Sequence, residues 1–80
     1  MSITLILYSR EGCHLCEDML DQLTELESEV GFAVEVRDVD TNPAWVKQFG
    51  ELVPILFLHN QEISRYFLDF KTLMEKIKNI

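Results

Sequence analysis

The chain has 80 residues, which is enough for one small domain spanning residues 1–80, and 48% of the residues are hydrophobic. Fourteen acidic residues against seven basic ones give a formal net charge of −7. This charge argues against nucleic acids and anionic membranes as partners, because both attract patches of Lys and Arg. The first apolar run, residues 3–8, is too short for a signal peptide, and nothing reaches transmembrane length. We therefore expect a cytoplasmic monomer.

The N-terminal part of the chain predicts a strand followed by a long helix. Residues 3–8 are apolar and β-branched with almost no polar alternation, which is typical of a strand buried on both faces. After a turn at residues 9–12, apolar residues recur at helical spacing, namely Leu15, Met19, Leu23, Leu26 and Val30. Gly31 is a suitable C-terminal stop for this helix.

The middle of the chain completes a β-α-β unit and adds a short helix. Residues 32–39 alternate between apolar and polar side chains, which indicates a strand nearer the edge of a sheet. We expect this strand to run parallel to the first one, with a right-handed crossover. Asn42 and Pro43 then suit the N-cap and first position of a short helix that ends before Gly50.

The last third of the chain predicts a hairpin and a final helix. Residues 55–58 are wholly apolar, residues 59–60 form a turn, and residues 62–67 return as an antiparallel strand. Asp69 caps a helix whose apolar side consists of Phe70, Leu73, Met74 and Ile77. The predicted order is β-α-β-α-β-β-α in an α/β fold, with the two apolar strands in the middle of the sheet.

The two cysteines, Cys13 and Cys16, lie where the first strand meets the first helix. A close cysteine pair in a cytosolic protein is more often catalytic or metal-binding than a structural disulfide. The amide groups and the dipole at a helix N-terminus lower the pKa of a thiol. Cys16 follows one turn later, within reach of a mixed disulfide on Cys13. The spacing therefore predicts Cys13 as the nucleophile and Cys16 as the resolving thiol.

Two other interpretations of the cysteine pair remain open at this stage. The cysteines can be ordinary unreactive residues, or they can bind zinc together with His14 and His59, which would complete four ligands. A structural zinc site usually pairs one CxxC with a second close pair of ligands, and the two histidines do not provide one.

Three further residues near the cysteines have a functional and a structural interpretation. His14 follows the nucleophile and as an imidazolium would stabilise its thiolate, or it is simply exposed. Arg10 is the cation of this loop; it would meet a carboxylate of a bound thiol or partner, or it is solvated. Pro54 belongs at the start of its strand, where the peptide bond after Val53 is either cis or trans.

Taken together, the chain resembles the glutaredoxin-like branch of the thioredoxin superfamily over nearly its whole length. The resemblance rests on residues 7–16, with the sequence LYSREGCHLC, on residues 39–40, and on residues 52–56, with the sequence LVPIL. It is greatest to small bacterial glutaredoxin-like proteins with a CHLC-type motif.

The resemblance implies a thioredoxin fold, in which a central four-stranded mixed sheet is flanked by helices. It also implies thiol–disulfide exchange with a protein or small-thiol disulfide, as part of cell redox homeostasis and electron transport. It implies that Pro54 is cis and packs beside the cysteines, that Val53 offers backbone hydrogen bonds to a substrate, and that Arg10 matches a basic position near the glutathione carboxylate. It implies no tightly held cofactor and no metal, with glutathione as a co-substrate.

The sequence departs from the glutaredoxin pattern in the stretch that holds the γ-glutamyl end of glutathione. Glutaredoxins have a Gly-Gly-x-Asp-type turn after the hairpin, whereas residues 64–69 read SRYFLD and contain no glycine. Only Asp69 can take the place of a family residue there. The alternative to an oxidoreductase is therefore a non-enzymatic thioredoxin-fold module that binds a protein partner, or a metal ion between two copies, through the same thiols.

Overall fold

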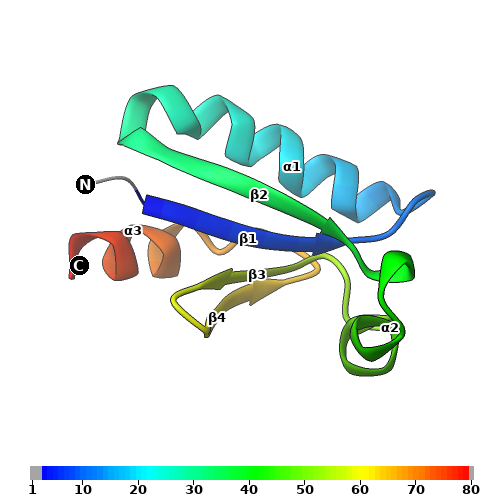
Figure 1. The fold of residues 1–80 in the computed structure, drawn as a ribbon. Helices are drawn as coiled ribbons and strands as arrows, with labels where there is room; N and C mark the ends of the chain where they lie inside the picture. The colour runs from blue at the N-terminus through cyan, green and yellow to red at the C-terminus, as the bar shows by residue number, and fades with distance from the viewer. Residues whose placement is uncertain (1–2, 80) are drawn as a thin grey trace.

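A computed structural model describes residues 3–79. A four-stranded sheet with the strand order β2-β1-β3-β4 forms its centre (Figure 1). The elements in chain order are β1 (Ile3–Ser9), α1 (His14–Leu26), β2 (Phe32–Asp38), α2 (Pro43–Phe49), β3 (Ile55–Leu58), β4 (Gln61–Arg65) and α3 (Phe70–Lys78). Within the described residues, no helix combines the length and the apolar character needed to cross a lipid bilayer.

The sheet is mixed, and its two apolar strands occupy the middle as predicted. β1 runs parallel to β2, from the pair Ile3–Phe32 to the pair Ser9–Asp38. β1 is antiparallel to β3, and β3 is antiparallel to β4. β2 and β4, which each have a neighbouring strand on one side only, have more exposed residues than β1 and β3. The order β-α-β-α-β-β-α and the mixed sheet are those of a thioredoxin fold.

Helix α1 covers one face of the sheet through the residues that recur at helical spacing. Met19 and Leu23 are almost fully buried. They pack in the main core with residues of all four strands and of α3, among them Leu5, Phe32, Leu56, Ile63 and Leu73. The helix continues as a π-helical turn, Glu27–Gly31, in which Gly31 has a φ of +89°. The predicted stop at Gly31 is therefore confirmed, because this left-handed conformation favours glycine.

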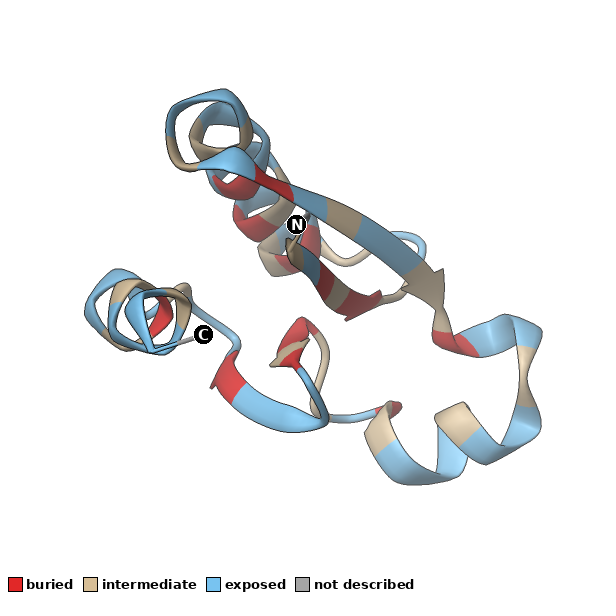
Figure 2. Ribbon diagram, turned by 60° about the vertical axis from the view of Figure 1, so that its left-hand side comes forward, coloured by how far each residue is buried: buried red, intermediate tan, exposed pale blue. Residues whose placement is uncertain are grey.

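A smaller aromatic cluster covers the opposite face of the sheet. The ring of Tyr8 lies 4.4 Å from that of Phe49 and 5.7 Å from that of Phe57, measured between ring centroids. Tyr8 points away from Leu7 because successive side chains of a strand alternate between the two faces. Helix α2 contributes Trp45 and Phe49 to this cluster. In Figure 2 the buried residues concentrate on β1, β3 and the inner side of α1.

The hairpin and the final helix differ from the prediction in two details. β4 ends at Arg65 instead of continuing to residue 67, because Tyr66 takes a φ of +69°, which ends the extended backbone. The N–H group of Tyr66 instead donates to the carbonyl oxygen of Pro54 at 2.7 Å. Phe70 was expected on the apolar side of α3 but remains 51% exposed, whereas Leu73 one turn later is fully buried.

The core on the α1 face predicts a large cost for removing one of its side chains. Leu23→Ala should lower the free energy of unfolding by about 2–5 kcal/mol, because it leaves a cavity between α1 and the sheet. Glu25→Ala, an exposed position of the same helix, should change it by less than about 0.5 kcal/mol. Urea denaturation followed by circular dichroism measures both values. A Leu23→Ala cost as small as that of the control would contradict the packing described here.

Candidate functional site

The cysteine pair lies at the junction between the loop after β1 and the first turn of α1. Cys13 is the N-cap of α1, with an extended backbone, and Cys16 lies in the first turn. The backbone N–H of Cys16 donates to the sulfur of Cys13 at 3.2 Å. The two sulfurs are joined in a disulfide, and their Cα atoms are 5.2 Å apart. The spacing-based prediction that the two sulfurs come within bonding reach is therefore confirmed.

The two cysteines differ in their access to solvent. Cys16 is only 3% exposed, whereas Cys13 is half-buried. An incoming thiol therefore reaches the sulfur of Cys13 more easily. After reduction, a Cys13 thiolate would accept the Cys16 N–H and would lie at the positive end of the α1 dipole, and both effects favour the anion. The roles of Cys13 as the attacking thiol and Cys16 as the resolving thiol remain a prediction, with which this difference in burial agrees.

The loop before Cys13 is held by its own backbone. The N–H of Cys13 donates to the carbonyl of Arg10 at 3.2 Å. Gly12 has a φ of +77°, a left-handed conformation that a residue with a side chain adopts only with strain. The glycine in front of the cysteine pair therefore has a backbone role.

Pro54 and the cysteine loop lie at the same end of the sheet, where β1 ends and β3 begins. The register between β1 and β3 ends with Tyr8 opposite Ile55, so continuation by one residue brings Pro54 opposite Ser9. The Val53–Pro54 peptide bond is cis, as the resemblance implied, and the Pro54 side chain is fully buried. Val53 precedes β3 and packs partly buried against the aromatic cluster. Its role in binding a substrate backbone remains a prediction.

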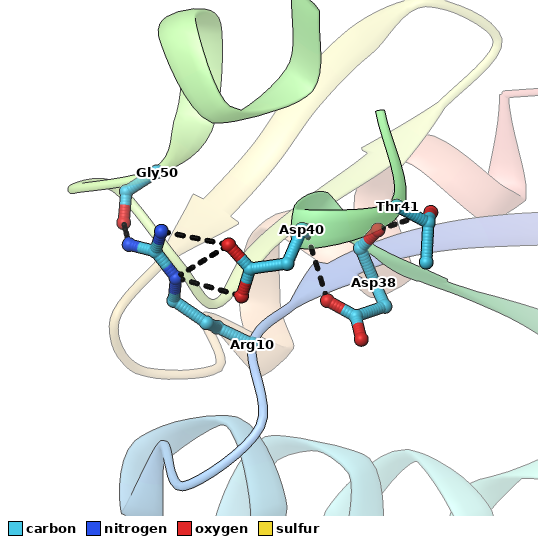
Figure 3. A network of polar contacts seen from close by, with 5 residues as sticks. All are labelled: Arg10, Asp38, Asp40, Thr41 and Gly50. Carbon is cyan, nitrogen blue, oxygen red and sulfur yellow. Dashed lines mark hydrogen bonds and ion pairs between the residues drawn. The ribbon is translucent and has the colours of Figure 1, made fainter. Parts of the chain in front are cut away.

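Arg10 is bound within the protein, an arrangement that neither interpretation of the sequence included. Its Nε lies 3.0 Å from Oδ2 and its Nη2 lies 2.8 Å from Oδ1 of Asp40, while its Nη1 donates to the carbonyl of Gly50 at 3.0 Å. Figure 3 shows the guanidinium between the Asp40 carboxylate and the end of α2. Arg10 thus ties the cysteine loop to the segment after β2 and to the segment after α2.

A small network after β2 holds Asp40 in place. The N–H of Asp40 donates to Oδ1 of Asp38 at 2.9 Å, and the Thr41 hydroxyl donates to the Asp38 carbonyl at 2.7 Å. The hydrogen-bonded ion pair raises the pKa of Arg10 and lowers the pKa of Asp40. One signal for this pair is present in the sequence. Arg10 and Asp40 follow the ends of two parallel strands, and such ends meet at one edge of a sheet.

His14 lies at the start of α1, on the solvent side. Its side chain is 86% exposed, and its Nε2 lies 3.7 Å from Oδ2 of Asp18 one turn later. This position corresponds to the exposed residue of the first helical turn. Stabilisation of the Cys13 thiolate by His14 remains a prediction.

The four residues considered for zinc are not gathered at one place. His59 lies in the β3–β4 turn, with a φ of 49°. Among residues 3–79, no three side chains of His, Cys, Asp or Glu are close enough together to hold one metal ion.

Residues 64–69, which stand where glutaredoxins have their glycine turn, form the end of β4 and the start of α3. Asp69 is the N-cap of α3: its Oδ1 accepts the N–H of Thr72 at 3.1 Å and its Oδ2 accepts the Thr72 hydroxyl at 2.7 Å. These hydrogen bonds lower the pKa of Asp69. Tyr66 adopts the left-handed backbone, and Phe67 beside it is 71% exposed. Both carboxylate oxygens of the one family-like residue are therefore occupied.

Of the hollows that adjoin α1, two lie near its N-terminal half. One, of about 290 Å³, lies beside Cys16, and four charged residues are among those that line it. Besides Arg10, its charged residues are Glu11, Glu17 and Asp38. The other, of about 150 Å³, lies between α1 and the turn after β4, and it is lined by apolar side chains such as Leu15 and Phe67 together with Asp18 and Gln22. Leu15 lies between the two cysteines in the sequence, but neither cysteine lines this second hollow.

The thioredoxin topology, a CxxC pair at the first helix and a cis-proline before the third strand together define a thioredoxin-fold domain with a disulfide-capable redox motif. A family profile described as "Glutaredoxin-like domain (DUF836)" matches residues 4–78. The chain therefore belongs to the glutaredoxin-like domain family.

Known proteins of similar sequence and structure extend this assignment without adding an activity. The solution structure of protein Ne2328 from Nitrosomonas europaea is 37% identical, with a TM-score of 0.82 over 92% of this chain and 89% of that one. Protein XcR50 from X. campestris is 27% identical, with a TM-score of 0.68 over 95% and 97%. The Mycobacterium tuberculosis protein Rv0508, described as uncharacterized, is 37% identical over 79% of this chain and 70% of its own length.

The burial difference between the two thiols predicts unequal reactivity. In the reduced protein, iodoacetamide should alkylate Cys13 at least about tenfold faster than Cys16, because Cys13 is accessible and its thiolate is stabilised by the helix start. Peptide mass mapping after short exposures gives both rates. Equal rates, or faster alkylation of Cys16, would contradict this assignment of the two cysteines.

The cap of α3 predicts a pH-dependent contribution to stability. A carboxyl group whose pKa is lowered by folding stabilises the protein above its ordinary pKa, and the contribution is lost as the pH falls through the folded value. Asp69→Asn should therefore lower the Tm by roughly 2–5 °C near pH 6 and by much less near pH 3. Thermal unfolding at a series of pH values measures the difference. A difference that does not change with pH would contradict the charged cap.

Proposed function

We propose that the protein is a thiol–disulfide oxidoreductase that cycles between a Cys13–Cys16 disulfide and the dithiol. One observation supports this most strongly. The sulfur of Cys13 caps α1 and accepts the N–H of Cys16, while the sulfur of Cys16 is almost fully buried beneath it. A single turn of helix thus offers an accessible, stabilised thiolate together with a protected second thiol.

The proposed cycle balances in atoms and electrons. The Cys13 thiolate attacks a substrate disulfide, a mixed disulfide forms on Cys13, and one substrate thiolate leaves and takes up a proton. The Cys16 thiol then loses its proton and attacks the Cys13 sulfur, which releases the second substrate thiol. The substrate has gained two electrons and two protons, and the protein disulfide is returned to the dithiol by two equivalents of an external thiol.

The substrate side of the reaction is proposed from the surroundings of the cysteines. Val53 and Pro54 would align the backbone of an extended substrate at the sheet edge, as in peptide recognition by strand addition. The hollow between α1 and the turn after β4, where Leu15 and Phe67 lie beside Asp18 and Gln22, would receive a side chain of a protein substrate. We therefore favour a protein disulfide over glutathione, and we place the cycle in the reducing cytoplasm.

Trapping experiments test the proposed roles of the two cysteines. Cys16→Ser should accumulate a mixed disulfide on Cys13 with bis(2-hydroxyethyl) disulfide, because the resolving thiol is missing. Cys13→Ser should give at least about tenfold less adduct, since its remaining thiol is buried. Intact-protein mass spectrometry measures the adducts, and the wild type should release them and end as the internal disulfide.

The opposite outcome would remove the enzymatic proposal. If Cys16→Ser forms no adduct, and if the wild-type dithiol reduces neither this small disulfide nor a disulfide-bonded protein, the chain does not exchange disulfides. A binding module with the same fold would then be the remaining interpretation.

A further inference from the structure

We propose that Asp40 determines which thiols react at the cysteine pair, by occupying the guanidinium of Arg10 so that carboxylate-bearing thiols find no free cation there. Thiols that carry a positive charge or no charge are then preferred over glutathione and other anionic thiols. This inference rests on the proposed function, because it specifies the substrate class of the same disulfide.

The contacts of Arg10 are those that a substrate carboxylate would need. Two of its nitrogens, Nε and Nη2, face the two oxygens of Asp40, and the third, Nη1, is engaged by the Gly50 carbonyl. A parallel pair of N–H groups facing one carboxylate is the geometry in which arginine recognises carboxylates in general. An external carboxylate would have to displace Asp40, whose own position is held by the Asp38 side chain.

The charges around the hollow beside Cys16 act in the same direction. Its lining contains Arg10 and three carboxylate residues, Glu11, Glu17 and Asp38. With Asp40 paired to Arg10, the remaining lining charge is negative. Within about one Debye length such a field repels anions and attracts cations, and the effect weakens as salt is added.

The reduction of the protein disulfide is the step that reports this preference. A small thiolate attacks the accessible Cys13 sulfur, the sulfur–sulfur bond breaks, and Cys16 leaves as a thiolate and takes up a proton. A second small thiolate attacks the mixed disulfide, which leaves the dithiol and the oxidised small molecule. Attacking thiolates of mercaptoacetate, mercaptoethanol and cysteamine carry net charges of −2, −1 and 0, so they differ mainly in charge.

The experiment measures second-order rate constants for reduction of the oxidised protein by these three thiols and by glutathione. Each constant is expressed per thiolate and corrected for nucleophilicity with its rate toward a small neutral disulfide. The corrected rate constants of the wild type should fall in the order cysteamine, mercaptoethanol, mercaptoacetate, with glutathione close to mercaptoacetate. The differences among these rate constants should become smaller as the salt concentration is raised.

Asp40→Asn is the decisive variant, because it removes the charge and keeps an oxygen that can accept from Arg10. In this variant the rate constants for reduction by mercaptoacetate and by glutathione should rise roughly three- to tenfold. The rate constant for mercaptoethanol should change by less than about twofold, and that for cysteamine should fall. Adding Arg10→Gln to Asp40→Asn should cancel most of the gain in rate for the anionic thiols, because the positive charge that Asp40 no longer neutralises is then absent.

Glu62→Gln is the matched control. Glu62 also holds an arginine through both of its oxygens, since Nε and Nη2 of Arg65 donate to it at 2.8 and 2.7 Å. The control removes the same unit of charge from β4, at the edge of the sheet opposite β2. It should leave the ratio between anionic and neutral thiols within about twofold of the wild type.

The inference is overturned if Asp40→Asn changes the rate constants of all the thiols by the same factor, or changes none of them. It is also overturned if Glu62→Gln shifts the ratio between anionic and neutral thiols as much as Asp40→Asn does. The neutral thiol separates this failure from failure of the proposed function. If mercaptoethanol reduces the disulfide of the wild type and the charge series is flat, only the role of Asp40 is lost. If no thiol of the series reduces it, the proposed exchange reaction is lost as well.

Discussion

The pairing of β1 with a strand on each side is the constraint on which the rest of the structure depends. β1 is parallel to β2 and antiparallel to β3. The last residues of β1 and β2 and the first residues of β3 therefore lie side by side at the same end of the sheet. The cysteine loop, the Asp40 turn and the cis-proline each follow or precede one of these strand ends. A redox site assembled from distant segments is therefore a consequence of strand order.

The Arg10–Asp40 ion pair is the contact on which the proposed discrimination against small anionic thiols rests. Its partners are half exposed, so the pair contributes little to stability by itself. Its importance lies in what it occupies. The carboxylate of Asp40 satisfies the one cation of the loop, and Asp69 is likewise engaged as a helix cap. The two charged residues that resemblance would assign to glutathione are thus both bound within the protein.

Much of the fold is predictable from residue patterns, because local rules and burial agree along most of the chain. The apolar runs of β1 and β3 mark the middle of the sheet, and Asn42, Gly31 and Asp69 mark helix ends. The end of β4 was not predictable in this way. Tyr66 continues an apolar pattern, but its backbone is left-handed and its N–H donates to the carbonyl of Pro54, the residue before β3.

The sequence by itself determined the cysteine pair at a helix start, the order of the elements and the position of Pro54, since each depends on neighbouring residues and on spacing. Tertiary structure alone decided that Arg10 binds Asp40 and the Gly50 carbonyl, and that β4 ends at Arg65. Both outcomes depend on contacts between segments that are distant in the sequence. Strand pairing sets such contacts, and local propensity carries no information about them.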